Sequence, residues 1–159
     1  MEGPFYQVES YRPRISIGYL LRRVSKLSQN QVEAGFDGND ITFTQWAVLA
    51  LTANDVADTC TGLARDLGHN SGAMTRVIDQ LEERGLLTRT RGACDRRVTN
   101  LAITDKGSAT VAKLAGSVVD LWNEILADFE RDEARQLIAL LTKLLARLEQ
   151  LESRREGSA

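Results

Sequence analysis

Apolar side chains recur at intervals of three and four residues in several stretches of this chain, a spacing that predicts amphipathic helices. The first helix is expected from Pro13, which fits a first helical turn, and its apolar face follows at Ile17, Leu20, Leu21, Val24 and Leu27. The last stretch has the intervals of a coiled-coil seam at Ala134, Leu137, Leu141, Leu144, Leu148 and Leu151. We therefore expect long helices with apolar faces at both ends of the chain, within residues 13–34 and 105–152.

The middle of the chain carries shorter helical patterns with clear start signals. Thr42 and Gln45 have the spacing of a capping box and open a helix that ends near residue 53. A second short helix begins near Thr59, and Asn70 caps a third helix over about residues 71–84, which Gly85 closes. The third helix turns an apolar stripe inward and leaves a polar face outside; the stripe is Met74, Val77, Ile78 and Leu81.

The second and third of these short helices are joined by a tight turn at residues 67–70, which predicts a helix-turn-helix. The second helix of such a motif can enter a DNA major groove. Residues 86–90 and 98–103 then alternate apolar and polar side chains and predict a β-hairpin, or wing, over about 86–103. The expected fold is mainly α with this small β-hairpin, and its winged helix-turn-helix lobe covers residues 42–104. The terminal helices have more apolar surface than this lobe can cover, which predicts dimerisation through both termini.

Charge is distributed unevenly along the chain. The 159 residues carry a formal net charge of −2 at pH 7, so overall basicity does not predict nucleic-acid binding. Between residues 84 and 97, however, a single acid accompanies five arginines: Arg84, Arg89, Arg91, Arg96 and Arg97. This local asymmetry favours a nucleic-acid contact at the hairpin over the alternative of a solvated basic hairpin without a partner.

Residue types that carry catalysis or bind metals are sparse. His69 is the lone histidine, and its place in the helix-turn-helix turn favours a structural or exposed role. We find no metal-ligand spacing and no nucleophile-base pair, so we expect no metal, no cofactor and no enzymatic activity. The two cysteines, Cys60 and Cys94, suit a reducing compartment. With neither a leader sequence nor a run of about 20 apolar residues, the chain is expected to be cytoplasmic and without membrane contact.

Several short motifs follow one another in a specific order and spacing: Leu63-Ala64, Leu67-Gly68, Met74-Thr75-Arg76, the run from Leu81 to Leu86, Asp95-Arg96-Arg97 and Ile103-Thr104. In this order they resemble the MarR family of transcriptional regulators, and the resemblance covers nearly the whole chain as a single domain of residues 1–159. It implies a sequence-specific DNA-binding regulator that acts as a ligand-responsive homodimeric repressor on a pseudo-palindromic operator. A winged-helix module that contacts only proteins is the alternative function.

The resemblance also implies which residues of the recognition helix, residues 71–84, contact DNA. In the family this helix enters the major groove, and here its contacts with bases or phosphates fall on Ser71, Ala73, Thr75 and Arg76. Small residues and hydroxyl groups at the N-terminus of a helix permit close approach to a phosphate. For Arg76 the alternative is a surface residue that pairs with Asp79 or Glu83.

In the wing, the resemblance assigns the minor-groove contact to Arg97. A narrow minor groove concentrates negative potential and attracts a guanidinium. Asp95 lies two residues earlier and can accept a hydrogen bond from Arg97 across the turn, although a solvated turn acid is the alternative. Phosphate contacts are expected from Arg89, Arg91 and Arg96. Cys94 at the tip is either an inert thiol or a redox sensor activated by the basic hairpin.

The family commonly binds small aromatic or phenolic anions between the DNA-binding lobe and the dimer helices. By this resemblance, a pocket for such an effector would be lined by Tyr19, Arg22, Arg23 and Trp46. The alternative is that the two aromatic residues belong to the ordinary core and the two arginines to a solvated face.

Overall fold

The computed structural model describes residues 3–36, 38–56, 58–91 and 99–157. Two compact units are present, Met1–Leu121 and Trp122–Ala159, and each is described here by itself. The helices of the first unit are a 3-10 turn, η1 (Pro13–Ile15), then α1 (Ile17–Ala34), α2 (Phe43–Ala53), α3 (Cys60–Asp66) and α4 (Ser71–Glu83). The strands β1 (Leu87–Arg91) and β2 (Thr99–Ile103) follow, and then α5 (Asp105–Ile125), whose last residues lie in the second unit with α6 (Arg131–Glu156). This is the mainly α fold with one β-hairpin that the sequence predicts.

Side-chain caps set the starts of these helices. The predicted capping box is confirmed, because the Gln45 amide donates to the Thr42 hydroxyl at 3.2 Å and the Thr42 amide donates to the Gln45 side chain at 3.1 Å. Thr59 caps α3 and Asn70 caps α4, also as predicted. The prediction that Pro13 opens the first α-helix is wrong. Pro13 starts the 3-10 turn, and α1 begins after Ser16, whose hydroxyl accepts the Tyr19 amide at 3.3 Å and so acts as the N-cap.

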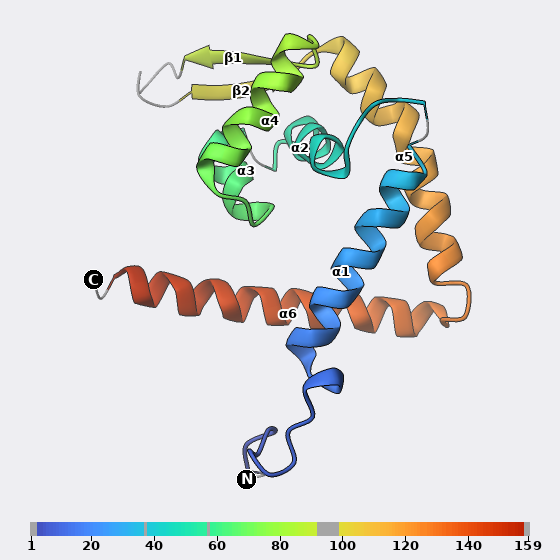
Figure 1. Ribbon diagram of the computed structural model, residues 1–159, viewed down its shortest axis with the longest axis vertical. Coiled ribbons are helices and arrows are strands. Elements are labelled where there is room, and N and C mark those ends of the chain that lie inside the picture. Colours follow the sequence, from blue (N-terminus) through green and yellow to red (C-terminus); the bar gives the residue numbers. More distant parts are fainter. Residues whose placement is uncertain (1–2, 37, 57, 92–98, 158–159) are drawn as a thin grey trace. The chain divides into compact units, whose positions relative to one another are not determined.

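The β-hairpin is antiparallel, with Leu87 opposite Ile103 and Arg91 opposite Thr99. It is tied to the start of the helix-turn-helix, because the Leu101 amide donates to the Asp58 carbonyl at 2.6 Å and Thr59 forms a bridge with Asn100. Helix α4 in turn packs against α2, α3 and β1 (Figure 1). The hairpin and α4 are therefore held by one set of contacts.

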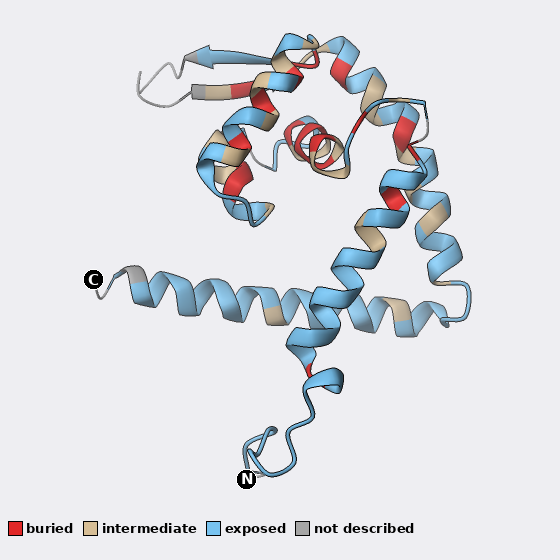
Figure 2. Ribbon diagram, viewed as in Figure 1, coloured by how far each residue is buried: buried red, intermediate tan, exposed pale blue. Residues whose placement is uncertain are grey.

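The core of the first unit lies between the helix-turn-helix, the hairpin and α5. Its largest fully buried side chains are Leu49, Leu63, Met74, Ile78, Leu81, Leu87, Leu114 and Val48. Helix α1 contributes one buried residue, Val32. By contrast, none of the described residues of α6 is buried, and Figure 2 shows that helix almost entirely in the colour of exposed residues. Among the described residues, we find no helix with the length and apolar character needed to cross a membrane.

Gly107 allows the first turn of α5 to lie directly on the start of the hairpin. A Cβ atom added at this position would lie 2.7 Å from Cγ1 of Ile103 and closer still to the carbonyl oxygen of Leu86. Because a backbone atom cannot move aside cheaply, we expect Gly107→Ala to lower the free energy of unfolding by about 2 kcal/mol. Urea denaturation followed by circular dichroism measures this change.

Gly116 provides the matched control, because it lies in the same helix with nothing within 4 Å of an added Cβ. Gly116→Ala should leave the free energy of unfolding unchanged or raise it by about 0.5–1 kcal/mol, as alanine favours a helix. An equal loss in both variants would contradict the close packing of Gly107 on Leu86 as the cause.

Candidate nucleic-acid interface

Helix α4 has two faces with different roles. Met74, Ile78 and Leu81 are buried in the core, whereas Ser71, Thr75 and Arg76 are exposed and Ala73 is half-buried. The side chain of Asn70 accepts the Ala73 amide at 2.8 Å, so one of the free amides of the first turn is already used by the cap. The remaining exposed face at the N-terminal end combines small residues, hydroxyl groups and one cation, which suits an approach to phosphates and base edges.

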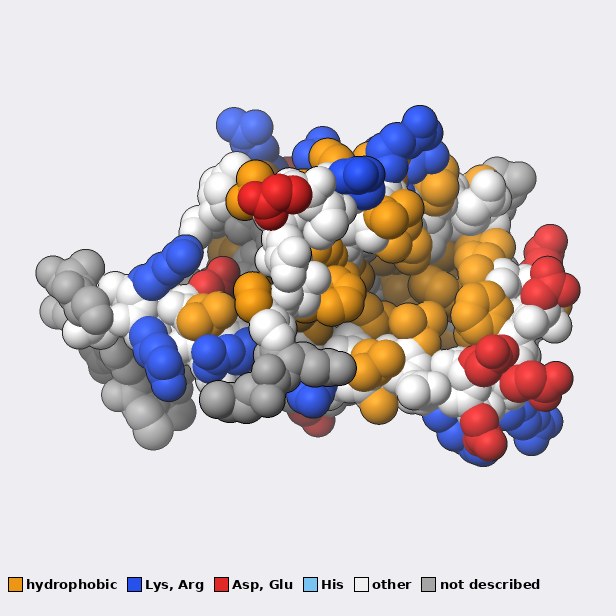
Figure 3. Space-filling model, turned by 90° about the horizontal axis from the view of Figure 1, so that it is seen from below, with side chains coloured by type: hydrophobic (Ala, Val, Ile, Leu, Met, Phe, Trp, Pro, Cys, Tyr) orange, Lys and Arg blue, Asp and Glu red, His pale blue; other side chains and the backbone are white. Residues whose placement is uncertain are grey.

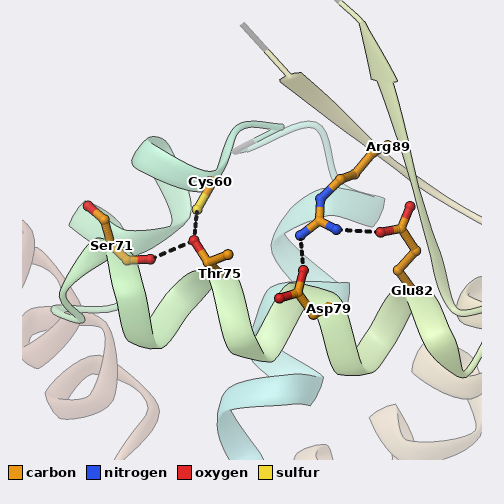
Figure 4. Close-up of polar contacts among 6 residues, drawn as sticks. All are labelled: Cys60, Ser71, Thr75, Asp79, Glu82 and Arg89. Atoms are coloured by element: carbon orange, nitrogen blue, oxygen red, sulfur yellow. Dashed lines mark hydrogen bonds and ion pairs between the residues drawn. The ribbon is translucent and has the colours of Figure 1, made fainter.

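The hydroxyl group of Thr75 is held in place from two sides. It donates to the Ser71 carbonyl at 2.8 Å, and the sulfur of Cys60 on α3 lies 3.6 Å from the same oxygen (Figure 4). The Thr75 oxygen keeps acceptor capacity for a further hydrogen bond. The sequence alone does not predict this contact, because nothing in the spacing of Cys60 and Thr75 indicates that the two helices meet at these residues.

Arg76 is exposed, and within the described part of the chain it takes part in no ion pair. The alternative predicted from the sequence, a pair with Asp79 or Glu83, is therefore not formed. Asp79 instead pairs with an arginine of the wing. The guanidinium of Arg76 is left available on the exposed face of α4.

Arg89 on β1 joins the wing to the recognition helix. Its guanidinium bonds Asp79 at 2.5 Å and also contacts the carboxylate of Glu82, both on α4 (Figure 4). The hydrogen bond with Asp79 raises the pKa of the Arg89 guanidinium above its ordinary value; partial burial opposes this shift and the charge of Glu82 adds to it. In this arrangement Arg89 neutralises two acids on α4 and links β1 to that helix.

The wing tip carries four residues singled out from the sequence: Cys94, Asp95, Arg96 and Arg97. All four lie in residues 92–98, outside the described residues. Arg91 is the last residue of β1 and lies opposite Thr99, and its side chain lies outside the described part as well. The minor-groove contact of Arg97 and the phosphate contacts of Arg91 and Arg96 stay predictions.

The structure separates the four residues expected to line an effector pocket into two kinds. Tyr19, Arg22 and Arg23 are exposed on α1. Trp46 is half-buried, with its ring centroid 5.9 Å from that of Phe36 and 6.1 Å from that of Phe43, and its buried Nε1 has no hydrogen-bond partner. Three surface cavities open beside residues 38–42, and none of them is lined by these four residues.

The remaining residues with possible metal or redox chemistry are dispersed. His69 is exposed, as the sequence analysis expected, and Cys60 is a half-buried free thiol. Within the described ranges, no three histidine, cysteine, aspartate or glutamate side chains gather as metal ligands. The polar groups that the described residues do bring together are those of α4, α3 and β1.

Comparisons with known proteins agree with this geometry. A family model described as the MarR family matches residues 39–98. The structure is similar to that of apo wild-type MarR from E. coli, with 28% identity, a TM-score of 0.69, and coverage of 82% of this chain and 97% of that chain. It is also similar to a cysteine-to-serine variant of E. coli MarR complexed with operator DNA, with 28% identity, a TM-score of 0.72 and coverage of 82% and 94%. A third similar structure is that of the transcriptional regulator BldR from Sulfolobus solfataricus. It is 27% identical to this chain, with a TM-score of 0.69, and the match covers 82% of this chain and 90% of BldR.

Proposed function

We propose that this chain, which belongs to the MarR family of DNA-binding transcriptional regulators, is a homodimeric repressor that binds a pseudo-palindromic operator and releases it when a small molecule binds. The observation that carries this proposal is the exposed face at the N-terminal end of α4. Ser71, Thr75 and Arg76 lie on this face, and Arg76 has no ion pair within the described residues. The opposite face of the helix is buried in the core. A rigid helix with such a face fits the major groove. Repression follows physically, because a dimer that covers an operator excludes other proteins from the same DNA.

The proposal of a homodimer rests on α6. This helix has 26 residues, and none of those described is buried. Leucines along one side are between 39% and 49% exposed: Leu137, Leu141, Leu148 and Leu151. Exposed hydrophobic side chains are visible at the surface in Figure 3. A second copy would cover the leucines and place two recognition helices about 34 Å apart, one turn of B-DNA.

For the effector we propose a small aromatic or phenolic anion. Two exposed cations, Arg22 and Arg23, lie one helical turn from Tyr19 on α1, and a phenolate or carboxylate would pair with them. Trp46 supplies an aromatic wall, and its unpaired Nε1 would gain a partner from a ligand oxygen. The ligand lowers operator affinity only if it binds the DNA-competent state and the other state unequally.

The experiment that tests DNA recognition is a titration of the protein against the DNA upstream of its own gene at several salt concentrations. For a specific complex, the logarithm of the binding constant should fall linearly with the logarithm of the salt concentration. A scrambled duplex of equal composition should bind more weakly. A winged-helix module that contacts only proteins predicts no dependence on salt or on sequence, and that result would remove the proposal.

Two arginines are expected to supply sequence-specific contacts, one from α4 and one from the wing tip. Arg76→Ala and Arg97→Ala should each weaken operator binding about tenfold, and binding to the scrambled duplex should change less. Electrophoretic mobility shifts with both duplexes measure the two affinities. Arg131→Ala, at the exposed start of α6, is the control and should bind as the parent protein does. Unchanged operator affinity in the Arg97 variant would exclude the minor-groove role.

A further inference from the structure

A small cavity with an unusual charge opens where the end of α4 meets the first turns of α5. Its volume is about 150 Å³. Three cationic side chains and one hydroxyl group line it, namely Arg84, Lys106, Lys113 and Thr110, and Ile41 and Leu86 supply apolar wall. The cavity lies within the first unit, and apart from Arg84, which belongs to the arginine-rich stretch of residues 84–97, none of its lining residues was expected to contact DNA or an effector.

None of the three cations has a carboxylate partner within the described residues. Each donates a hydrogen bond to a neutral acceptor instead: Lys106 to the Arg84 carbonyl at 2.7 Å, Lys113 to the Asn39 side chain at 2.6 Å, and Arg84 to the Asp40 carbonyl at 2.6 Å. These bonds hold the charged groups in place around the cavity. They do not cancel the mutual repulsion of three positive charges, which an anion would relieve.

The two neighbouring cavities differ from this one in the charge of the residues that line them. One is lined by Glu33 and Asp40, and the other by Asp40 and Glu83 together with Arg84. The cavity at Lys106 and Lys113 has no acidic residue among those that line it. A negatively charged ligand is therefore favoured in the cavity at Lys106 and Lys113. It is disfavoured in the cavity at Glu33 and Asp40, where none of the described lining residues is cationic.

We infer that this cavity binds the phosphoryl group of a small ligand, either inorganic phosphate or a short phosphate monoester. A dianion balances two of the three positive charges, whereas a carboxylate balances only one. The three cations offer several N–H donors to the phosphoryl oxygens, whereas the Thr110 hydroxyl already donates to the Lys106 carbonyl at 2.8 Å. The position is distinct from the DNA-facing end of α4, since Arg84 follows the C-terminal end of that helix and Ser71 begins it, about 20 Å away along 13 residues.

Titration of the full-length protein with sodium phosphate, at constant ionic strength set with sodium chloride, tests this inference by isothermal titration calorimetry. Lys113→Met and Lys106→Met should each weaken phosphate binding about tenfold, the loss of one charged hydrogen bond. Lys143→Met, an exposed lysine on α6, is the control and should bind phosphate as the parent protein does. Circular dichroism verifies that each variant is folded, and Lys113 is the safer position because its ammonium bonds only a side chain.

Phosphate could also reach this cavity as part of the DNA backbone, so a second arm measures binding to the scrambled duplex without added phosphate. If the cavity takes a soluble ligand, Lys113→Met should leave this affinity within about twofold of the parent value. Loss of DNA binding in the same variant would assign the cavity to the DNA backbone and overturn the inference. The inference also fails if phosphate binding is absent in the parent protein, or is weakened equally by Lys143→Met. None of these outcomes depends on the proposed repressor function.

Discussion

Glutamate in place of Leu137, Leu141 and Leu148 should make the protein monomeric and lower its operator affinity by more than about a hundredfold. These leucines lie on one side of α6, and each is at least 40% exposed in the single chain. A dimer would bury them, and burial of an unpaired carboxylate costs far more than burial of a leucine gains. A monomer holds only one recognition helix and loses the gain from binding two half-sites at once. Sedimentation velocity measures the mass, and mobility shifts measure the affinity.

The matched control places three glutamates on the opposite side of the same helix, at Gln136, Ala146 and Gln150. Both triple variants change the net charge by −3, since each replaces three uncharged residues with glutamate. The control variant should stay dimeric, which separates the loss of apolar contact from general repulsion between acidic chains. Ending the chain after Phe129 should give the same monomer as the leucine variant. A dimer that survives in the leucine variant would show that the interface lies elsewhere.

Local signals in the sequence were sufficient for much of the fold. Thr42 and Gln45 predicted the start of α2 because a capping box uses residues three apart. Asn70 predicted the start of α4 because its side chain can accept a free amide of the first turn. The misplaced start of α1 has an equally local cause. Pro13 is compatible with a 3-10 turn as well as with an α-helix, and the capping hydroxyl of Ser16 decides between the two.

Contacts between distant segments were not predictable from spacing. From the sequence Arg89 was expected to contact a phosphate, because the sequence shows its neighbours along the strand but not the acids of α4 across from it. Asp79 and Glu82, three residues apart on one helix face, were the available signal. The basic cavity brings together Asn39 and Lys113, whose side chains bond at 2.6 Å across 74 positions. Such pairs depend on how α4, α5 and the 38–42 loop pack, which no local pattern encodes.

Arg89→Met should weaken operator binding about thirtyfold, or about 2 kcal/mol. In the parent protein the guanidinium neutralises Asp79 and Glu82, which are 47% and 38% exposed on the recognition helix. Without it, two carboxylates would face the DNA phosphates, and β1 would lose its ionic contact with α4. The free energy of unfolding should change little, because exposed ion pairs contribute at most about 1 kcal/mol. Mobility shifts measure the affinity, and urea denaturation measures the stability.

A second variant tests whether Arg89 acts through these acids or touches a phosphate directly, as the sequence analysis expected. The triple variant Asp79→Asn, Glu82→Gln, Arg89→Met removes the carboxylates together with the arginine. If the arginine acts by neutralising them, operator affinity should recover to within about fivefold of the parent protein, since no uncompensated acid is left on α4. If Arg89 binds a phosphate, the triple variant should bind the operator as weakly as Arg89→Met. The slope of log affinity against log salt concentration should then be smaller by about one than in the parent protein. The pair of carboxylates on Arg89 favours the first result, because a guanidinium whose positive charge is already offset by two carboxylates attracts a phosphate only weakly.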